Sequence, residues 1–241
     1  MPHTILARFG FVAGAILAGS GCGSETPVAQ QPATTTSVAP ASPFRIMPLG
    51  DSITQADSEH DSYRRPLWKS LKARGHSTDF VGTQTSNHRG GPPHSDFDID
   101  HEGHWGWRVD EILEPLPGWV ENQRPDAILV HLGSNDLFQR QSVESTLEEL
   151  SRLVDIASAT EPSPVIFIAQ IIPTTTESAN RRIRELNAEI ARLGEHPSVR
   201  IVDHYTGFDG ARLTYDGVHP NVDGEIRMAE RWLAALEEIL P

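Results

Sequence analysis

The stretch FRIMPLGDSIT, residues 44–54, runs an apolar segment directly into a glycine, an aspartate and a serine. An apolar run that stops at a glycine is typical of a buried strand that ends in a tight turn. In α/β proteins, ligands bind beyond the carboxyl ends of such strands. Ser52 is therefore a candidate nucleophile. The alternative is structural, because Asp51 and Ser52 are also residue types that cap a following helix.

Alternating strand and helix patterns continue to the end of the chain. Apolar runs bounded by turn residues predict strands, and the continuous run AILVHLG is typical of a strand buried on both faces. The predicted strands lie at residues 44–50, 77–82, 127–133, 165–173 and 199–205. Apolar residues at spacings of three and four predict helices, which lie at residues 63–74, 142–158, 177–194 and 221–240.

Two further segments complete this pattern. Residues 108–123 look helical, but Pro115 and Pro117 must break that helix. Residues 83–107 show no period and are predicted to be irregular. The last helix is expected to present one apolar side, formed by Ile226, Ala229, Trp232, Leu233, Leu236 and Leu240.

Five strands, each followed by a helical segment, predict an α/β fold. The expected architecture is a three-layer α/β/α domain with a five-stranded parallel sheet of flavodoxin-like type, covering residues 44–241. The sequence shows no internal repeat and no second domain. Because parallel strands bring their carboxyl ends to one edge, the chemistry should lie just after each strand.

Polar residues gather at three of these positions. Ser52 follows the first strand, GSND at 133–136 follows the third, and YDGVHPN at 215–221 precedes the last helix. A serine hydroxyl needs an adjacent base, which His219 can provide, and Asp216 is close enough to hold the other imidazole nitrogen. The Ser52 N–H, the Asn135 amide and an unshielded glycine N–H could stabilise an oxyanion. These parts predict acyl transfer.

Four blocks in order resemble the SGNH hydrolase superfamily. They are GDSIT at 50–54, a glycine within HEGHWGWR at 101–108, GSND at 133–136 and DGVHPN at 216–221. The resemblance implies the SGNH hydrolase fold, an acyl-serine intermediate and no cofactor.

The same resemblance assigns roles to single residues. It makes Ser52 the nucleophile, His219 the base and Asp216 its orienter, with Ser52, Gly106 and Asn135 forming the oxyanion hole. For the glycine there is an alternative, because Gly103 lies in the same loop and Gly106 could be a turn glycine between two tryptophans.

Within the superfamily, the segments DFVGTQ, HEGHWGWR and YDGVHPN resemble carbohydrate esterase family three and related acetylxylan esterases. That resemblance implies removal of acetyl groups from polysaccharides. Trp105 and Trp107 fit this substrate class, since aromatic faces suit sugar rings. A lysophospholipase or thioesterase of the same superfamily, or a surface carbohydrate-binding protein without turnover, are the alternatives.

The first 43 residues have a different character. Arg8 precedes an apolar core at 9–18 and small residues follow, which is the layout of a secretory signal ending at residue 22. Cys22, the single cysteine, follows LAGSG and resembles a lipobox, although Gly19 stands where such boxes usually carry a leucine. This implies lipidation and a periplasmic or surface location in the cell envelope; secretion with a free Cys22 is the alternative. Residues 23–43 predict a flexible tether.

The charge balance limits the partners. The chain carries 20 Lys and Arg against 33 Asp and Glu, a formal net charge of −13. An acidic domain repels phosphate backbones and anionic lipid headgroups, which argues against nucleic acid and leaves the membrane as a partner only through a lipid anchor at Cys22. A neutral acetylated carbohydrate suits it better.

Several other polar residues receive structural interpretations. Asp96, Asp98 and Asp100 alternate as in a calcium loop, but His101 and Trp107 stand where that loop needs glycine and glutamate. No zinc spacing and no catalytic metal are predicted. The loop histidines 88, 94, 101 and 104 are interpreted as solvated, with His101 fixing the loop, and His131 and His204 as structural. Asp136 is expected to brace its loop, while Arg108 could pair with an acidic neighbour or contact substrate.

Overall fold

The computed structural model describes residues 10, 11, 14 and 42–241. The predicted leader, Cys22 and the tether therefore fall almost wholly outside the described residues. No helix within the described ranges combines the length and the hydropathy needed to cross a bilayer. The residues from Ala41 to Pro241 form one compact unit built around a parallel sheet.

The sheet contains all five predicted strands. Their order is β2-β1-β4-β5-β6, and every pair in it is parallel. The bounds are β1 Phe44–Gly50, β2 Thr78–Phe80, β4 Ala127–His131, β5 Val165–Gln170 and β6 Val199–Asp203. The predicted flavodoxin-like arrangement, in which the first strand lies inside the sheet, is thereby confirmed.

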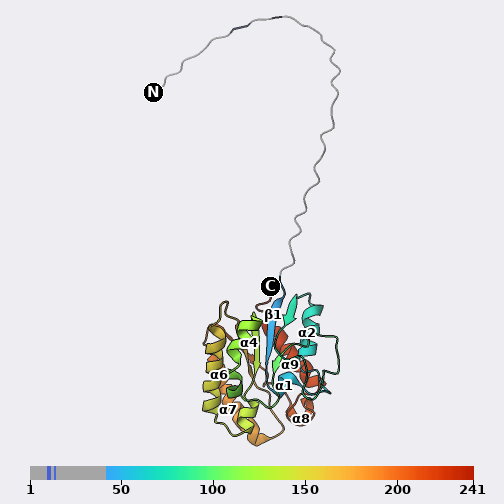
Figure 1. Cartoon of the computed structure of the whole chain (residues 1–241), viewed down its shortest axis with the longest axis vertical. Coiled ribbons are helices and arrows are strands. Elements are labelled where there is room, and N and C mark those ends of the chain that lie inside the picture. Colours follow the sequence, from blue (N-terminus) through green and yellow to red (C-terminus); the bar gives the residue numbers. More distant parts are fainter. Residues whose placement is uncertain (1–9, 12–13, 15–41) are drawn as a thin grey trace, which may run out of the picture. The chain divides into compact units, whose positions relative to one another are not determined.

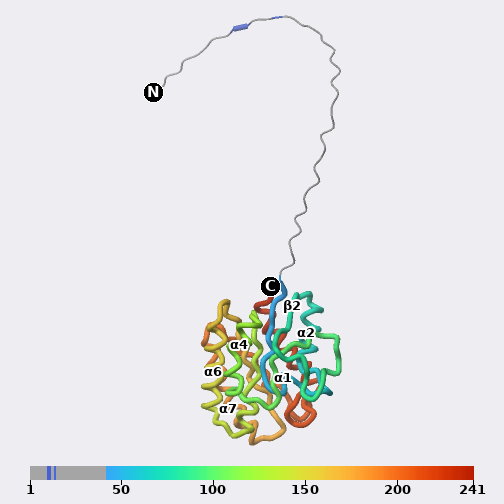
Figure 2. The backbone as a smooth tube through the Cα atoms, viewed as in Figure 1, coloured from blue at the N-terminus to red at the C-terminus, as the bar shows by residue number. Residues whose placement is uncertain are grey.

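A sixth strand was not predicted. β3, Glu102–Gly103, pairs in parallel with Leu49 and Gly50 at the end of β1. It lies in the segment between β2 and α3 that was predicted to be irregular, and Figure 2 shows that segment as a winding trace. Two residues are too few to produce a periodic pattern in a sequence, so this strand depends on tertiary pairing.

Helices cover both faces of the sheet (Figure 1). Their bounds are α1 Ser52–Gln55, α2 Arg64–Ala73, α3 Val109–Leu113, α4 Leu116–Gln123, α5 Ser134–Phe138, α6 Val143–Ser158, α7 Glu177–Leu193, α8 Gly210–Leu213 and α9 Val222–Leu236. Residues of α3, α4, α6 and α7 pack in one apolar core with Met47, Ile128 and Val130, whereas α2 and α9 pack in the other with Ile46 and Leu129. Alternate strand residues thus face opposite layers, which gives the predicted three layers.

The four long predicted helices are present with bounds that match within one residue, except that α9 ends at Leu236 and not at residue 240 and that one of its faces differs. Helix formation stops between α3 and α4, where Pro115 stands, as predicted. The same prediction is wrong for Pro117, which lies in the first turn of α4, where no backbone N–H is needed for the helix. Ile226 is 43% exposed, although the apolar pattern placed it on the buried side of α9. The preceding residue, Glu225, is buried instead, because its carboxylate contacts His60 on a neighbouring loop. Glu225 is charged, so a pattern of apolar residues along the helix cannot predict that it faces inward.

The turn after β1 explains why a glycine precedes the candidate nucleophile. A Cβ at Gly50 would lie 2.3 Å from Thr54 Oγ1 and 2.7 Å from the backbone oxygen of His131. Asp51 caps the short helix that follows, since its Oδ1 accepts from the Ile53 N–H at 2.9 Å. Ser52 is the first residue of that helix. The capping interpretation of Asp51 and the interpretation of Ser52 as a candidate nucleophile are therefore compatible.

Candidate active site

Ser52, His219 and Asp216 form a hydrogen-bonded line at the carboxyl edge of the sheet. Ser52 begins α1, whereas the other two residues lie in the loop between α8 and α9. Nε2 of His219 lies 2.9 Å from Oγ of Ser52, and Nδ1 of His219 lies 2.7 Å from Oδ2 of Asp216. These distances are within hydrogen-bonding range. The arrangement can pass the serine proton to an imidazole that a carboxylate holds in place.

Asp216 is fixed by its own loop. Its Oδ1 accepts from the backbone N–H groups of Val218 and His219 at 2.9 and 2.8 Å. Partial burial raises the pKa of Asp216, but the hydrogen bonds from the backbone and ring of His219 outweigh it and hold the pKa below its usual value. An ionised Asp216 accepts from Nδ1–H, which leaves Nε2 as the acceptor that faces Ser52.

Asn135 reaches the same place from α5, just after β4. Its Nδ2 donates to the backbone oxygen of Trp107 at 2.9 Å and lies 3.5 Å from Oδ2 of Asp51. The first contact orients the amide, while the second is too long for a strong hydrogen bond. The contact with Trp107 uses one N–H of Asn135. The other N–H of the same amide has no strong hydrogen bond and is available to a developing oxyanion.

A small cavity lies among these groups. It has a volume of about 190 Å³, and its lining includes Ser52, Gly106, Asn135, Phe138 and His219. Ligand pockets commonly measure roughly 300–1,000 Å³, so this cavity suits a small group.

Gly106 and Gly103 occupy different surroundings. Gly106 lines the cavity and adopts φ +82°, a left-handed conformation that strains other residues. Gly103 instead pairs with Gly50 inside the sheet as part of β3. Within the described part of the chain, the backbone N–H groups of Ser52 and Gly106 form no hydrogen bond. The structure therefore places Gly106, and not Gly103, in the wall of the cavity beside Ser52 and Asn135.

Asp51 places a buried carboxyl group beside this cavity. Burial, together with the nearby Asp136, raises the pKa of Asp51 to about 7, although the hydrogen bond from Ile53 N–H opposes the change. The group is therefore substantially protonated near neutral pH. A neutral carboxyl repels an oxyanion less than an ionised one would.

Five aromatic rings lie in a continuous stack through the site. In order they are His88, Trp105, His219, Tyr215 and His60, with successive ring centroids 4.4, 4.7, 5.7 and 4.3 Å apart. Adjacent planes differ by 10–19°. Sequence patterns predicted a sugar-binding role for Trp105 and no role for Tyr215 or His60. The stack holds the imidazole of the candidate base between neighbouring rings.

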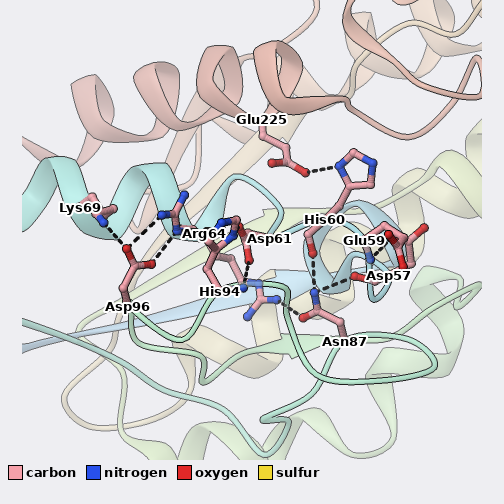
Figure 3. Close-up of polar contacts among 11 residues, drawn as sticks. Asp57, Glu59, His60, Asp61, Arg64, Lys69, Asn87, His94, Asp96 and Glu225 are labelled. Atoms are coloured by element: carbon pink, nitrogen blue, oxygen red, sulfur yellow. Dashed lines mark hydrogen bonds and ion pairs between the residues drawn. The ribbon is translucent and has the colours of Figure 1, made fainter.

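The stack ends at a buried carboxylate. Oε1 of Glu225 lies 3.1 Å from Nδ1 of His60, and Figure 3 shows the two groups directed at each other. Burial raises the pKa of Glu225 to about 7, whereas the contact with His60 opposes that rise. The hydroxyl of Tyr215 donates to Oδ2 of Asp57 at 3.0 Å, and Asn87 donates to the backbone oxygens of Asp57 and His60. The loop between α1 and α2, which carries His60, is thus tied both to Tyr215 and to Asn87.

The remaining histidines are mostly structural. His131 and His204 are buried and do not line the cavity, as expected. The expectation that their polar atoms are satisfied is wrong for His204, because neither of its ring nitrogens has a hydrogen-bond partner among the described residues. The interpretation of the loop histidines as solvated is wrong for His101, which is fully buried: its Nδ1 accepts from the Gly103 N–H and its Nε2 lies 3.2 Å from the Ser86 backbone oxygen. It does fix the loop, as expected. His104 is also largely enclosed, because its ring stacks on tryptophans.

The alternating aspartates Asp96, Asp98 and Asp100 do not form a metal site. Asp96 binds Arg65 and Lys69, of which Figure 3 labels Lys69, and Asp98 accepts from the backbone N–H groups of Phe80 and Asp100. Basic side chains and backbone donors therefore occupy the oxygens that a calcium ion would need.

Two polar residues near the site have structural contacts. Oδ1 of Asp136 accepts from the Val109 N–H at 3.1 Å, which braces its loop as expected. Arg108 pairs with an acidic neighbour, since its Nε and Nη2 each lie 2.8 Å from a carboxylate oxygen of Asp110.

The family model of the GDSL-like Lipase/Acylhydrolase family matches residues 49–225. This span contains Ser52, Asp216, His219 and every residue that lines the cavity. The chain belongs to this family. Its parallel sheet with helices on both faces also matches the solved relatives of that fold.

Two solved structures and one curated protein illustrate the likeness to other GDSL-like proteins. A crystal structure of an acetyl esterase mutant with acetate ion is 28% identical, covers 81% of this chain and 97% of its own, and superposes with a TM-score of 0.72. A carbohydrate esterase family 3 structure from Talaromyces cellulolyticus is 29% identical with the same coverage and TM-score. A multidomain esterase of Ruminococcus flavefaciens is 28% identical over 227 residues, 83% of this chain and 29% of that protein. The chain thus spans less than a third of that curated relative.

Proposed function

We propose that this protein is a serine esterase that removes O-acetyl groups from carbohydrate through an acyl-serine intermediate. The observation that carries the proposal is the line from Ser52 through His219 to Asp216, facing a small cavity that Asn135 and Gly106 also line.

In the first half-reaction, Oγ of Ser52 attacks the ester carbonyl carbon while Nε2 of His219 takes its proton. The carbonyl oxygen becomes an oxyanion, which accepts from the N–H groups of Ser52 and Gly106 and from Nδ2 of Asn135. The C–O bond to the sugar then breaks, and His219 returns the proton to the departing sugar oxygen. Ser52 is left as its acetyl ester.

In the second half-reaction, water replaces the sugar. His219 takes a proton from the water as its oxygen attacks the acetyl carbon, and the same donors hold the second oxyanion. Collapse releases acetate and returns the proton to Oγ of Ser52. Asp216 stabilises the imidazolium in both halves without taking the proton itself.

The cavity supports a short acyl group. At about 190 Å³ it is smaller than a typical ligand pocket, and Phe138 and Trp105 contribute apolar walls. The relatives described as an acetyl esterase and a carbohydrate esterase support the same substrate class. The acidic surface charge agrees with a neutral substrate rather than an anionic lipid.

The test compares acetate release from acetylated xylan with hydrolysis of nitrophenyl acetate, butyrate and octanoate, using the parent protein, Ser52→Ala and His219→Ala. We expect acetate release and nitrophenyl acetate hydrolysis from the parent, falling activity as the acyl chain lengthens, and neither activity in the two variants. Rising activity toward octanoate would move the assignment to a lysophospholipase or thioesterase. Absence of all turnover in a folded parent protein would favour a carbohydrate-binding role.

We also propose that the protein is secreted across the inner membrane and held in the cell envelope by a lipid on Cys22. The support is the sequence of residues 1–22 and the tether composition of residues 23–43. Expression of the full chain and of Cys22→Ser in a bacterial host, followed by fractionation, tests this. The parent should sediment with membranes and the variant should not; equal distribution of both would contradict the anchor.

A further inference from the structure

Three carboxylates meet beside the oxyanion loops. Asp110 lies in the first turn of α3, Asp136 in α5 and Glu149 in α6. Each offers one carboxylate oxygen, and these three oxygens all lie within 4.8 Å of one another. Like charges so close together repel unless something positive lies between them.

Two of these carboxylates each have a buried oxygen without a partner. Asp136 is fully buried, and its Oδ2 forms no hydrogen bond to any described residue, although its Oδ1 accepts from Val109 N–H. Oε2 of Glu149 is likewise inaccessible and has no hydrogen-bond partner in the described part of the chain. A buried charged oxygen without a donor is strongly disfavoured. Two such oxygens in one cluster point to a missing positive ligand.

The neighbouring side chains neutralise only one member of the cluster. Arg108 donates to both carboxylate oxygens of Asp110, each at 2.8 Å, and also lies 3.8 Å from Glu111, a fourth carboxylate. Among the ion pairs of the described residues, those of Arg108 are the ones that reach this cluster. Oε1 of Glu149 accepts only from uncharged groups, the Gln141 amide and the Ser145 hydroxyl.

We propose that Asp110, Asp136 and Glu149 bind one divalent cation, and that Ca²⁺ fits the site better than Mg²⁺. Oxygen ligands are those that both ions prefer, but Mg²⁺ usually takes one or two protein carboxylates and requires strict octahedral geometry. Ligands on opposite sides of a Ca²⁺ are roughly 4.6–5.2 Å apart, twice the Ca–O distance, so three oxygens within 4.8 Å of one another are close enough to share one ion. Asp110 would exchange one of its two hydrogen bonds with Arg108 for the ion. The exposed Asp110 leaves room for water ligands.

The role of this ion is structural. It joins three helices, of which α5 carries Asn135 and α3 follows the loop that carries Gly106. None of the three carboxylates belongs to the proposed catalytic line, so binding can be measured without any assay of turnover. This inference therefore does not depend on the proposed esterase function.

The experiment is a calorimetric titration of the full, EDTA-treated protein with CaCl₂ and separately with MgCl₂, together with thermal unfolding. We expect one Ca²⁺ per chain, weaker binding of Mg²⁺, and a Tm that rises by about 5–10 °C at saturating Ca²⁺. Glu149→Gln and Asp110→Asn should each weaken Ca²⁺ binding by about tenfold or more. Glu148→Gln, which changes an exposed residue next to Glu149, is the matched control and should bind as the parent does.

Two results would overturn the proposal. One is a parent protein that shows neither binding heat nor a Tm shift with either ion. The other is unchanged Ca²⁺ binding in both Glu149→Gln and Asp110→Asn, which would place the ion elsewhere. Tighter binding of Mg²⁺ than of Ca²⁺ would contradict the choice of ion. Asp110→Asn keeps the test usable even if Glu149→Gln fails to fold, because Asp110 is exposed.

Discussion

The indole of Trp105 lies against the imidazole of His219, with ring centroids 4.7 Å apart and planes 19° from parallel. This contact has two consequences for a histidine that must accept a proton during catalysis. It restricts rotation of the ring away from Ser52, and the face of an indole attracts the positive charge that the imidazole acquires. Tyr215 makes a similar but longer contact, at 5.7 Å.

Trp105→Leu should therefore lower kcat for nitrophenyl acetate about fivefold, since a cation–π contact at a partly exposed site contributes on the order of 1 kcal/mol. Trp105→Phe keeps an aromatic face and should lose less. Steady-state kinetics of both variants check this. If Trp105 served only to bind sugar, KM for acetylated xylan would rise while kcat stayed at the parent value in both variants.

Asn135→Ala should reduce kcat by about 10²–10³ with little change in KM, because an oxyanion donor acts mainly in the transition state. Steady-state kinetics with nitrophenyl acetate measure this reduction in kcat. Since Asn135 also donates to the Trp107 backbone oxygen, the Tm of the variant must be compared with that of the parent. A folded Asn135→Ala protein with parental kcat would remove this residue from the oxyanion hole.

Asp216→Asn should damage the reaction less than His219→Ala does. The base and the oxyanion donors remain in the first variant, whereas the second loses the group that accepts the serine proton. By analogy with other serine hydrolases, the difference should be about one to two orders of magnitude in kcat. Equal or greater loss in Asp216→Asn would contradict this ranking.

His131 should make the protein less stable in acid. Burial lowers its pKa to about 4, while an unfolded histidine has a pKa near 6.5. The stabilisation is thus fully present above pH 6.5 and is lost as the pH falls toward 4, by about 3 kcal/mol in total. Denaturant unfolding of the parent and of His131→Leu between pH 7 and pH 4 tests this. The variant should show a shallower loss; identical slopes would mean that His131 does not carry the effect.

Local sequence patterns predicted which edge of the sheet carries the candidate site, but not the short strand and the loop that lie beside it. Ser52 and Asn135 could be predicted because each directly follows a strand, so the fold itself determines where they lie. His219 and Asp216 could be paired because three residues separate them in one loop. The short β3 and the position of Gly106 depend on how a long loop folds back on β1, which no periodic pattern encodes.

The ring stack and the buried carboxylates were missed for a related reason. His60 and Glu225 are 165 residues apart in the sequence, and their contact places a charged side chain inward on α9. Ile226 was assigned to the buried side by its spacing, yet the helix turns so that its neighbour Glu225 is enclosed. The cluster of Asp110, Asp136 and Glu149 likewise joins three helices, and none of these residues stands at a spacing typical of metal ligands.

Covalent labelling of Ser52 tests the proposed mechanism most directly. The full chain is incubated with a nitrophenyl alkylphosphonate, whose phosphorus mimics the tetrahedral centre, while residual esterase activity and the mass of each peptide are followed. We predict one phosphonyl group per chain, attached to Ser52, with activity lost in proportion to labelling and no labelling of His219→Ala. Full labelling of Ser52 with activity retained, or loss of activity through labelling of a different residue, would contradict the central claim.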